Sequence, residues 1–357
     1  MNWRHAAALA ALALLAAAGI AGARTVTLIY ASPYGPDHPF SVADRQWIRW
    51  VEHASHGALH IYPVWSGALL SSDQSLIELR HGVADIGLIT PIYVLGDTQM
   101  IRAQTAFYAG ARTIDQQVAM YQCLSRSSPE FARELRGLKI LAVQGGTLPG
   151  IVTRTHPVRT LADLKDLRIR APTELLGVLR DLGADPVDMP MDEVYSALAK
   201  GVLDGVVAPL DTFKSLHFAD VAKYYTRIAI PRGAYPARAM GLAAWRRLDP
   251  ANRAILDAST AIWERALARQ IDDAAASGES VARYDGVRFL DIPPADQRRF
   301  DALYESDARR SAESLARYGL DGISLYDYAR RISENLESTG RVSCDESAAP
   351  AAPTGGR

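Results

Sequence analysis

The chain has 357 residues, which is enough for two lobes rather than one small domain. Hydrophobic residues make up 48% of it and charged residues 22%, a balance that excludes wholesale disorder. The 39 Lys and Arg against 40 Asp and Glu leave a formal charge of −1, so no basic excess favours nucleic-acid binding, and the two Cys are too few for a disulfide scaffold or a structural zinc site.

Residues 1–23 have the organisation of a secretory signal peptide. Arg4 precedes an apolar stretch at 6–20, and the small residues at 21–23 suit signal peptidase. The apolar stretch is shorter than the roughly 20 residues of a membrane-spanning helix. We therefore expect export and a mature chain that starts near Arg24. The alternative is an N-terminal membrane anchor that stays attached.

Strand-like and helix-like segments alternate through the next 200 or so residues. The expected strands are residues 25–30, 59–64, 138–143, 167–171 and 227–230. The expected helices include residues 41–54, 114–135 and 174–182. This alternation predicts α/β sheets with helices on both faces.

Two segments, 73–89 and 192–208, repeat one pattern at a constant offset of 119 residues. In each, a first Asp can cap a short helix, a Gly can end it in the left-handed conformation, and an apolar run then enters a buried strand. We expect one such unit in each of two lobes, with chance similarity as the alternative. The matching residues are Asp73, Gly82 and Asp85 in the first segment and Asp192, Gly201 and Asp204 in the second.

The C-terminal third is predicted to be helical. Residues 250–283 are a run of helix formers that begins at Pro250, and at 1.5 Å per residue they would reach about 45–50 Å, longer than one small lobe. Further helices are expected at 294–316 and 325–336, and residues 345–357 have the composition of a disordered tail.

The two cysteines, Cys123 and Cys344, lie far apart in the sequence. In an oxidising compartment they could form a long-range disulfide. Whether the two sulfurs meet is left open at this point.

Several short motifs, in their order and spacing over roughly residues 25–340, resemble the solute-binding proteins of tripartite ATP-independent periplasmic (TRAP) transporters, of the dicarboxylate-binding (DctP) type. No one of them is highly specific by itself. They are SGAL at 66–69, GVADIG at 82–87, LADLKDLRIRAP at 161–172, LGADPV at 182–187, GVLDG at 201–205 and WRRL at 245–248.

The resemblance implies a two-lobed α/β periplasmic solute-binding protein fold with hinge strands and a long lobe-spanning helix. Lobe I would comprise 24–147 plus 234–272, and lobe II 148–233 plus 273–344. Such a protein binds a small carboxylate in the cleft between the lobes and delivers it to a membrane permease. We therefore expect a monomeric periplasmic receptor with no catalytic residues, no cofactor, no metal and no nucleic-acid partner.

In that family an Arg at the end of the strand in the 161–172 motif binds the ligand carboxylate, and here it is Arg170. A guanidinium is permanently charged, and its fork matches a carboxylate with two parallel hydrogen bonds. In the alternative interpretation, Arg170 pairs with an internal acid. Arg168 competes for the role only if the strand register slips.

Other ligand-binding candidates follow from position alone, and each could equally serve packing or capping. Asp73 in particular could be a helix cap. The candidates are Met191, Tyr195, Ala208, Thr212 and Phe213 in the second half, and Ser32, His38, Phe40, Asp73, Gln74 and Tyr93 in the first.

Two departures from the family pattern bear on the ligand. Ala208 stands where sialic-acid-binding members have Asn, and Gly150 or its neighbours stand where those members have a second Arg. Both changes remove polar partners, so a smaller or more apolar carboxylate fits better than a sialic acid.

Two other classes of function remain as alternatives: a ligand-sensing partner of a membrane receptor, and a periplasmic enzyme acting on a carboxylate. Enzyme signatures are weak. His53, His56 and His60 do not have a convincing metal-ligand spacing, and the glycines near 145–150 lack the Lys-Ser/Thr of a phosphate-binding loop.

Overall fold

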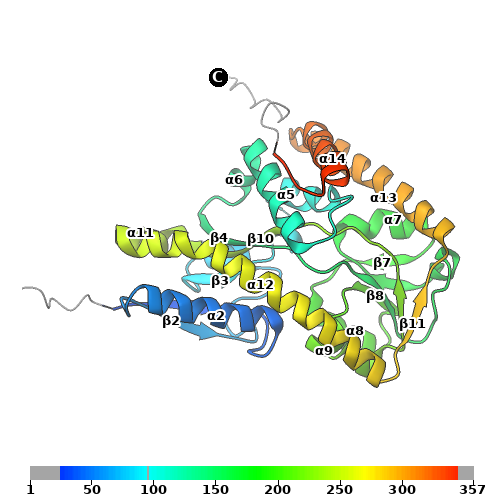
Figure 1. The fold of residues 1–357 in the computed structure, drawn as a ribbon, viewed down its shortest axis with the longest axis horizontal. Coiled ribbons are helices and arrows are strands. Elements are labelled where there is room, and N and C mark those ends of the chain that lie inside the picture. The colour runs from blue at the N-terminus through cyan, green and yellow to red at the C-terminus, as the bar shows by residue number, and fades with distance from the viewer. Residues whose placement is uncertain (1–24, 95, 345–357) are drawn as a thin grey trace, which may run out of the picture.

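The computed structural model describes residues 25–94 and 96–344, so the expected signal peptide and C-terminal tail lie outside the described residues. Two sheets form the framework (Figure 1), with strand orders β2-β1-β3-β10-β4 and β11-β9-β5-β8-β6-β7. We call each sheet with its covering helices the first lobe and the second lobe. The first sheet contains β1 (Val26–Ala31), β2 (Leu59–Val64), β3 (Ile86–Leu88), β4 (Leu138–Gln144) and β10 (Tyr235–Gly241). The second contains β5 (Gly150–Thr153), β6 (Arg168–Arg170), β7 (Asp185–Val187), β8 (Gly205–Ala208), β9 (Tyr224–Arg227) and β11 (Arg288–Asp291).

Helices surround both sheets. The α-helices are α2 (Pro39–Ala54), α3 (Ser75–Arg80), α4 (Gln99–Ala103), α5 (Ile114–Ser127), α6 (Glu130–Glu134), α7 (Leu176–Asp181), α8 (Val194–Ala199), α9 (Thr212–Ser215), α10 (Phe218–Val221), α11 (Leu242–Arg247), α12 (Pro250–Tyr284), α13 (Pro294–Ser314) and α14 (Gly322–Thr339). Short 3₁₀ helices are η1 (Pro91–Tyr93), η2 (Gln104–Ala106), η3 (Leu161–Leu164), η4 (Thr173–Leu175), η5 (Met191–Glu193) and η6 (Leu315–Tyr318). The α/β class that the sequence predicts is confirmed.

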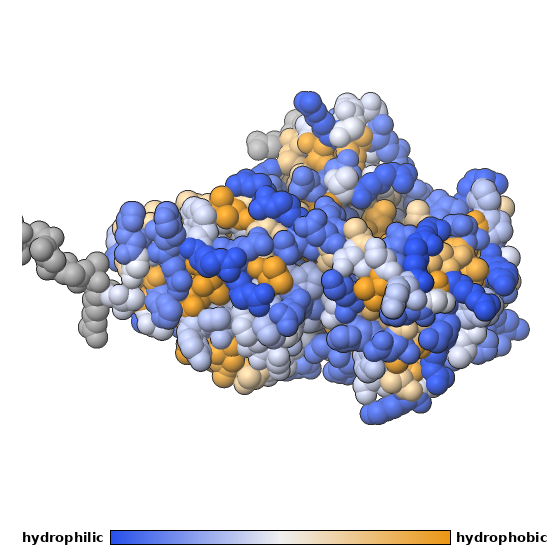
Figure 2. Space-filling model, turned by 60° about the horizontal axis from the view of Figure 1, so that its bottom comes forward, coloured by the Kyte–Doolittle hydropathy of each residue, from blue (hydrophilic) through white to orange (hydrophobic). Residues whose placement is uncertain are grey.

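The face shown in Figure 2 is mostly hydrophilic, with hydrophobic residues in separate small patches. Among the described residues, no helix combines the length and the apolar composition that crossing a bilayer requires.

The chain crosses between the two sheets at residues 145–149, between β4 and β5, and again at 228–234, between β9 and β10. The expected strand at 227–230 is wrong, because β9 ends at Arg227 and the residues after it enter this second crossing. The crossing is tightly packed: a Cβ added to Gly233 would lie 2.7 Å from the Cα of Thr105. We call these two segments the hinge crossings.

Helix α12 joins the lobes, as the sequence predicts. It begins at Pro250 behind Asp249, whose carboxylate accepts a hydrogen bond from the Asn252 amide at 2.8 Å, and it runs for 35 residues. Trp263 of α12 stacks on Trp47 in the core of the first lobe, with ring centroids 3.6 Å apart. Near the other end of α12, Gly278 lets the helix pack directly on the chain after β8: a Cβ there would lie 2.1 Å from the Leu210 carbonyl oxygen.

The repeated pattern gives the same local structure twice. The helices before β3 and β8 both end at a glycine with positive φ, +78° at Gly82 and +71° at Gly201. The second Asp of each unit accepts a hydrogen bond from the neighbouring parallel strand, at 2.9 Å in both cases: Asp85 from the Ile29 amide and Asp204 from the Arg168 amide.

The capping role expected for the first Asp of each unit is wrong. Asp73 precedes the N-cap residue of α3, Gln74, which makes no side-chain cap. Asp192 lies inside η5 rather than before it, and it accepts a hydrogen bond from the Ser72 hydroxyl at 2.9 Å instead.

The expected helix at 114–135 is broken into α5 and α6 around Pro129, which has no amide hydrogen to continue the helix.

The C-terminal region attaches to both lobes. A disulfide joins Cys123 of α5 to Cys344, with a Cα–Cα distance of 5.2 Å. Helix α14 packs in the core that contains α5, whereas Phe300 and Tyr304 of α13 pack in the second lobe. The lobe boundaries expected above stay a prediction.

Candidate ligand-binding site

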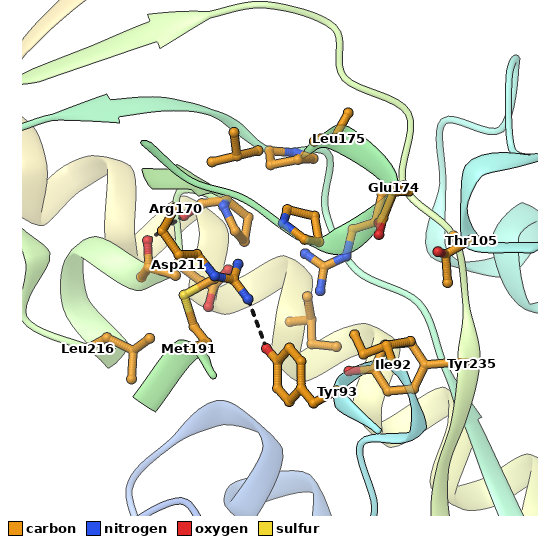
Figure 3. Close-up of a pocket in the computed structure, with 18 of the residues that line it drawn as sticks. Ile92, Tyr93, Thr105, Arg170, Glu174, Leu175, Met191, Asp211, Leu216 and Tyr235 are labelled. Carbon is orange, nitrogen blue, oxygen red and sulfur yellow. Dashed lines mark hydrogen bonds between the residues drawn. The ribbon is translucent and has the colours of Figure 1, made fainter. Parts of the chain in front are cut away.

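A cavity of about 100 Å³ lies between the two lobes and is lined by residues from both (Figure 3). Its walls are largely apolar or aromatic. It adjoins a wider groove of about 780 Å³ that shares Tyr34, His38, Asp211 and Leu216 with it. Ligands of α/β proteins bind at the carboxyl ends of strands, and β6 and β8 both end at this cavity.

Arg170, the last residue of β6, is 2% exposed. Its Nε donates to the Met189 carbonyl at 2.9 Å, and its Nη2 donates to the Tyr93 hydroxyl at 3.1 Å, the dashed line in Figure 3. Within residues 25–94 and 96–344 it forms no ion pair. Arg168, two residues earlier, instead pairs with Asp185 at the surface, at 2.9 Å. The buried guanidinium therefore faces the cavity without an internal counter-ion.

Two carboxyl groups line the same cavity, those of Glu174 and Asp211. Burial raises the pKa of Glu174, against the opposing effects of the Thr105 hydroxyl and the guanidinium groups of Arg170 and Arg232. Burial also raises the pKa of Asp211, against the opposing effects of Arg232 and of the Ser215 hydroxyl, which donates to Asp211 at 3.2 Å. The cavity thus combines the guanidinium groups of Arg170 and Arg232 with two carboxyl groups whose pKa values are raised by burial.

The first lobe contributes stacked rings. His38 lies on Tyr34 with centroids 4.2 Å apart, and its Nδ1 accepts from the Phe40 amide at 3.2 Å, which caps α2. Burial, with a further contribution from Arg238, lowers the pKa of His38 to about 3. The imidazole is therefore neutral at physiological pH and carries its hydrogen on Nε2.

Beneath these rings, Arg238 and Asp44 form a fully buried ion pair at 2.8 Å. The same carboxylate accepts from the Tyr30 hydroxyl at 2.5 Å and from the Trp263 indole at 2.8 Å. This arginine is neutralised inside the first lobe, so its charge is not available to a ligand.

The structure brings six of the sequence-predicted residues to the cavity: Arg170, Met191, Thr212, His38, Phe40 and Tyr93. It places the others elsewhere. Tyr195 is 38% exposed on α8, and Asp73 and Gln74 are exposed before α3. Three are buried outside the lining: Ala208 in β8, Phe213 against Tyr225, and Ser32, whose hydroxyl accepts from the Tyr34 amide.

Sequence reasoning missed several lining residues, notably Tyr34, Glu174, Asp211, Arg232 and Tyr235. Glu174 and Asp211 each follow a proline by two positions just after a cavity-facing strand, a signal that could have found them. Arg232 lies between Pro231 and Gly233, two residues that are typical of a connecting segment. They do not indicate that the Arg232 side chain reaches a cavity.

Three histidines considered as a metal cluster do not form one. His60 pairs with Glu52 at 2.7 Å. No group of three or more His, Cys, Asp or Glu in the described part of the chain could hold a metal ion.

The profile of DctP, bacterial extracellular solute-binding protein family 7, matches residues 32–314. A solute-binding protein of Albidiferax ferrireducens is 27% identical over 186 residues, 49% of this chain and 52% of that protein. The 2,3-diketo-L-gulonate-binding periplasmic protein of Escherichia coli is 27% identical over 166 residues, 43% of this chain and 48% of that protein. The chain thus spans about half the length of each of these two relatives.

Solved structures share the fold. The structure of a TRAP solute-binding protein from Rhodoferax ferrireducens, in complex with copurified benzoate, superposes with a TM-score of 0.80 at 23% identity. The match covers 89% of this chain and 100% of that one.

Proposed function

The chain belongs to family 7 of the bacterial extracellular solute-binding proteins, a family of transport receptors rather than enzymes, and from this premise we propose that it is a periplasmic receptor that encloses a small organic acid between its lobes and delivers it to a TRAP-type membrane permease. Monomeric action belongs to the same proposal.

The observation that carries this proposal is Arg170, a buried guanidinium without an internal counter-ion at a cavity between two lobes. An enclosed cation of this kind is costly unless a ligand neutralises it, and a carboxylate does so with two parallel hydrogen bonds. The ligands named for relatives, a diketogulonate and benzoate, are both carboxylates.

Three hydrogen bonds cross between the lobes around the cavity: Arg170 to Tyr93, Ser72 to Asp192, and Arg102 to Thr173 at 3.2 Å. These contacts require the lobes to be close together. Since the carboxylate neutralises Arg170, it favours the closed arrangement over the open one. The permease would then recognise the closed shape rather than the ligand itself.

A thermal-shift screen of the mature protein over small organic acids tests the proposal. A ligand at 100 times its dissociation constant adds about 2.7 kcal/mol to stability. Arg170→Ala should lose about 2–5 kcal/mol of binding free energy for any acid that binds, because truncation leaves the ligand carboxylate buried and unpaired.

Arg168→Ala, in the same strand but paired at the surface, is the matched control and should bind normally. Calorimetry that finds equal affinity in wild type and Arg170→Ala would remove Arg170 from the site. If no organic acid shifts the melting temperature of the wild type, the receptor function is wrong.

A further inference from the structure

A second arginine of the cavity, Arg232, is held by backbone rather than by an acid. It lies on the hinge crossing from β9 to β10, and its guanidinium covers the other crossing: a Cβ added to Gly146 would lie 2.3 Å from the Arg232 Cζ. Its Nη1 donates to the Thr147 carbonyl at 3.3 Å. Only a glycine at position 146 lets the guanidinium lie this close to the chain.

Arg232 forms no ion pair within residues 25–94 and 96–344, although Glu174 and Asp211 line the same cavity. Its neighbour Gly233 packs on Thr105, and Figure 3 shows Thr105 and Glu174 on the side of the pocket away from Arg170. A ligand whose carboxylate lies at Arg170 would therefore extend toward Glu174 and Arg232.

The charges of the cavity restrict what that far end can be. One ligand carboxylate offsets the charge at Arg170, and a second carboxylate at the far end would lie beside the carboxyl group of Glu174 as well as beside Arg232. A hydroxyl group suits both neighbours, because it can accept from a guanidinium and donate to a carboxylate. The walls between the two ends include Phe40, Ile92 and Leu175 and favour an apolar body.

We propose, on the basis of the receptor function above, that Arg232 selects monocarboxylic acids that carry a hydroxyl group at the end opposite the carboxylate, by donating to that hydroxyl from the hinge. Arg170 supplies affinity for all acids, and Arg232 supplies discrimination among them.

Calorimetry with matched ligand pairs tests this inference: benzoate with 3-hydroxybenzoate, and phenylacetate with 3-hydroxyphenylacetate. The wild type should prefer the hydroxylated member of a pair. Arg232→Met should lower affinity for the hydroxylated acid at least about tenfold, because a hydrogen bond to a charged group is lost, and change affinity for the plain acid much less.

Gly146→Ala provides a second variant that leaves Arg232 in the chain. The added Cβ displaces the guanidinium, so this variant should reproduce the selective loss. Gly96→Ala, at a glycine with no atom within 4 Å of the added Cβ, and Arg299→Met, at an exposed position, are the matched controls and should keep the wild-type preference. Thermal melts establish that each variant is folded.

The outcomes distinguish a failure of the selective role of Arg232 from a failure of the receptor function. If the wild type binds both acids equally, or if Arg232→Met leaves the ratio of the two affinities unchanged, Arg232 does not select and the inference is overturned. If the wild type binds none of the four acids and none in the wider screen, the receptor function itself fails, and the inference fails with it.

Discussion

Each repeat unit pairs with a parallel strand in its own lobe, and the two partner strands carry different side chains. In the first lobe Ala31 of β1 pairs with Gly87, and in the second lobe Arg170 of β6 pairs with Val206 at the corresponding position. The 119-residue offset relates the two partner positions. The strand pairing is therefore duplicated, but only the partner strand in the second lobe carries a charge that faces the cavity.

Buried arginines show the same contrast between the lobes. Arg238 of the first lobe is fully buried and is neutralised by Asp44, whereas Arg170 of the second is almost as buried and has no acid partner. A paired buried arginine is neutralised within the core, whereas an unpaired one is an uncompensated buried charge, which is the basis for the proposal that Arg170 binds an external anion. Substitutions that break the Arg238–Asp44 pair should therefore lower stability, whereas substitutions of Arg170 should lower ligand binding.

The largest effect is expected from breaking the internal pair. Asp44→Ala should cost about 3–5 kcal/mol of unfolding free energy, because it leaves Arg238 as an uncompensated buried charge. Urea denaturation followed by circular dichroism measures it. Asp185→Ala, which breaks the surface pair with Arg168, should cost less than about 1 kcal/mol. Similar losses in both variants would contradict the contrast.

Arg170→Lys should weaken acid binding by about 1.5–3 kcal/mol, since a point charge cannot reproduce the forked hydrogen bonds of a guanidinium. The unfolding free energy without ligand should stay close to that of the wild type, because no internal acid loses its partner. Calorimetry and denaturation of the same preparation measure both quantities. A variant that loses stability but keeps its affinity would mean that Arg170 serves the core, as Arg238 does.

The first lobe should also confer a pH dependence on stability. The pKa of His38 is lowered to about 3 in the folded chain, below the ordinary value of 6.5, so protons bind preferentially to the unfolded chain. The contribution of His38 to the free energy of unfolding is therefore fully present above pH 6.5. It is lost as the pH falls toward 3, by up to about 1.4 kcal/mol per pH unit. Denaturation of wild type and His38→Gln across this range isolates the contribution. Parallel stability curves for the two proteins would show that His38 does not titrate in this way.

The smallest effect concerns the contact between the lobes. Tyr93→Phe removes the hydroxyl that accepts from Arg170 and should weaken acid binding by about 0.5–1.5 kcal/mol. Tyr62→Phe, at a tyrosine that is 59% exposed in the first lobe, is the control and should bind as the wild type does. Tighter binding in Tyr93→Phe would indicate that the hydroxyl competes with the ligand for Arg170.

The features that the sequence predicted are those set by local patterns. The glycines that end the repeat helices depend on backbone preferences within a few residues, and α12 depends on a run of helix formers after Asp249-Pro250. Arg170 was found because a family motif surrounds it. Arg168, two residues earlier, has the same strand parity, so parity alone could not identify the binding residue. Arg170 is buried at the cavity, whereas Arg168 is at the surface.

Residue types and periodicities by themselves determined the α/β class, the repeat and the long helix, because each depends on interactions between residues close in the chain. Only the tertiary structure decided which side chains meet: Cys123 with Cys344, Arg238 with Asp44, and Arg232 with the backbone at Gly146. These partners lie 86 to 221 positions apart, so their contact depends on how the two sheets and the hinge crossings pack. Met191 lies in η5 and lines the cavity, whereas Tyr195 lies in the next helix, α8, and is 38% exposed; where the 3₁₀ turn gives way to the α-helix is a difference that no local pattern specifies.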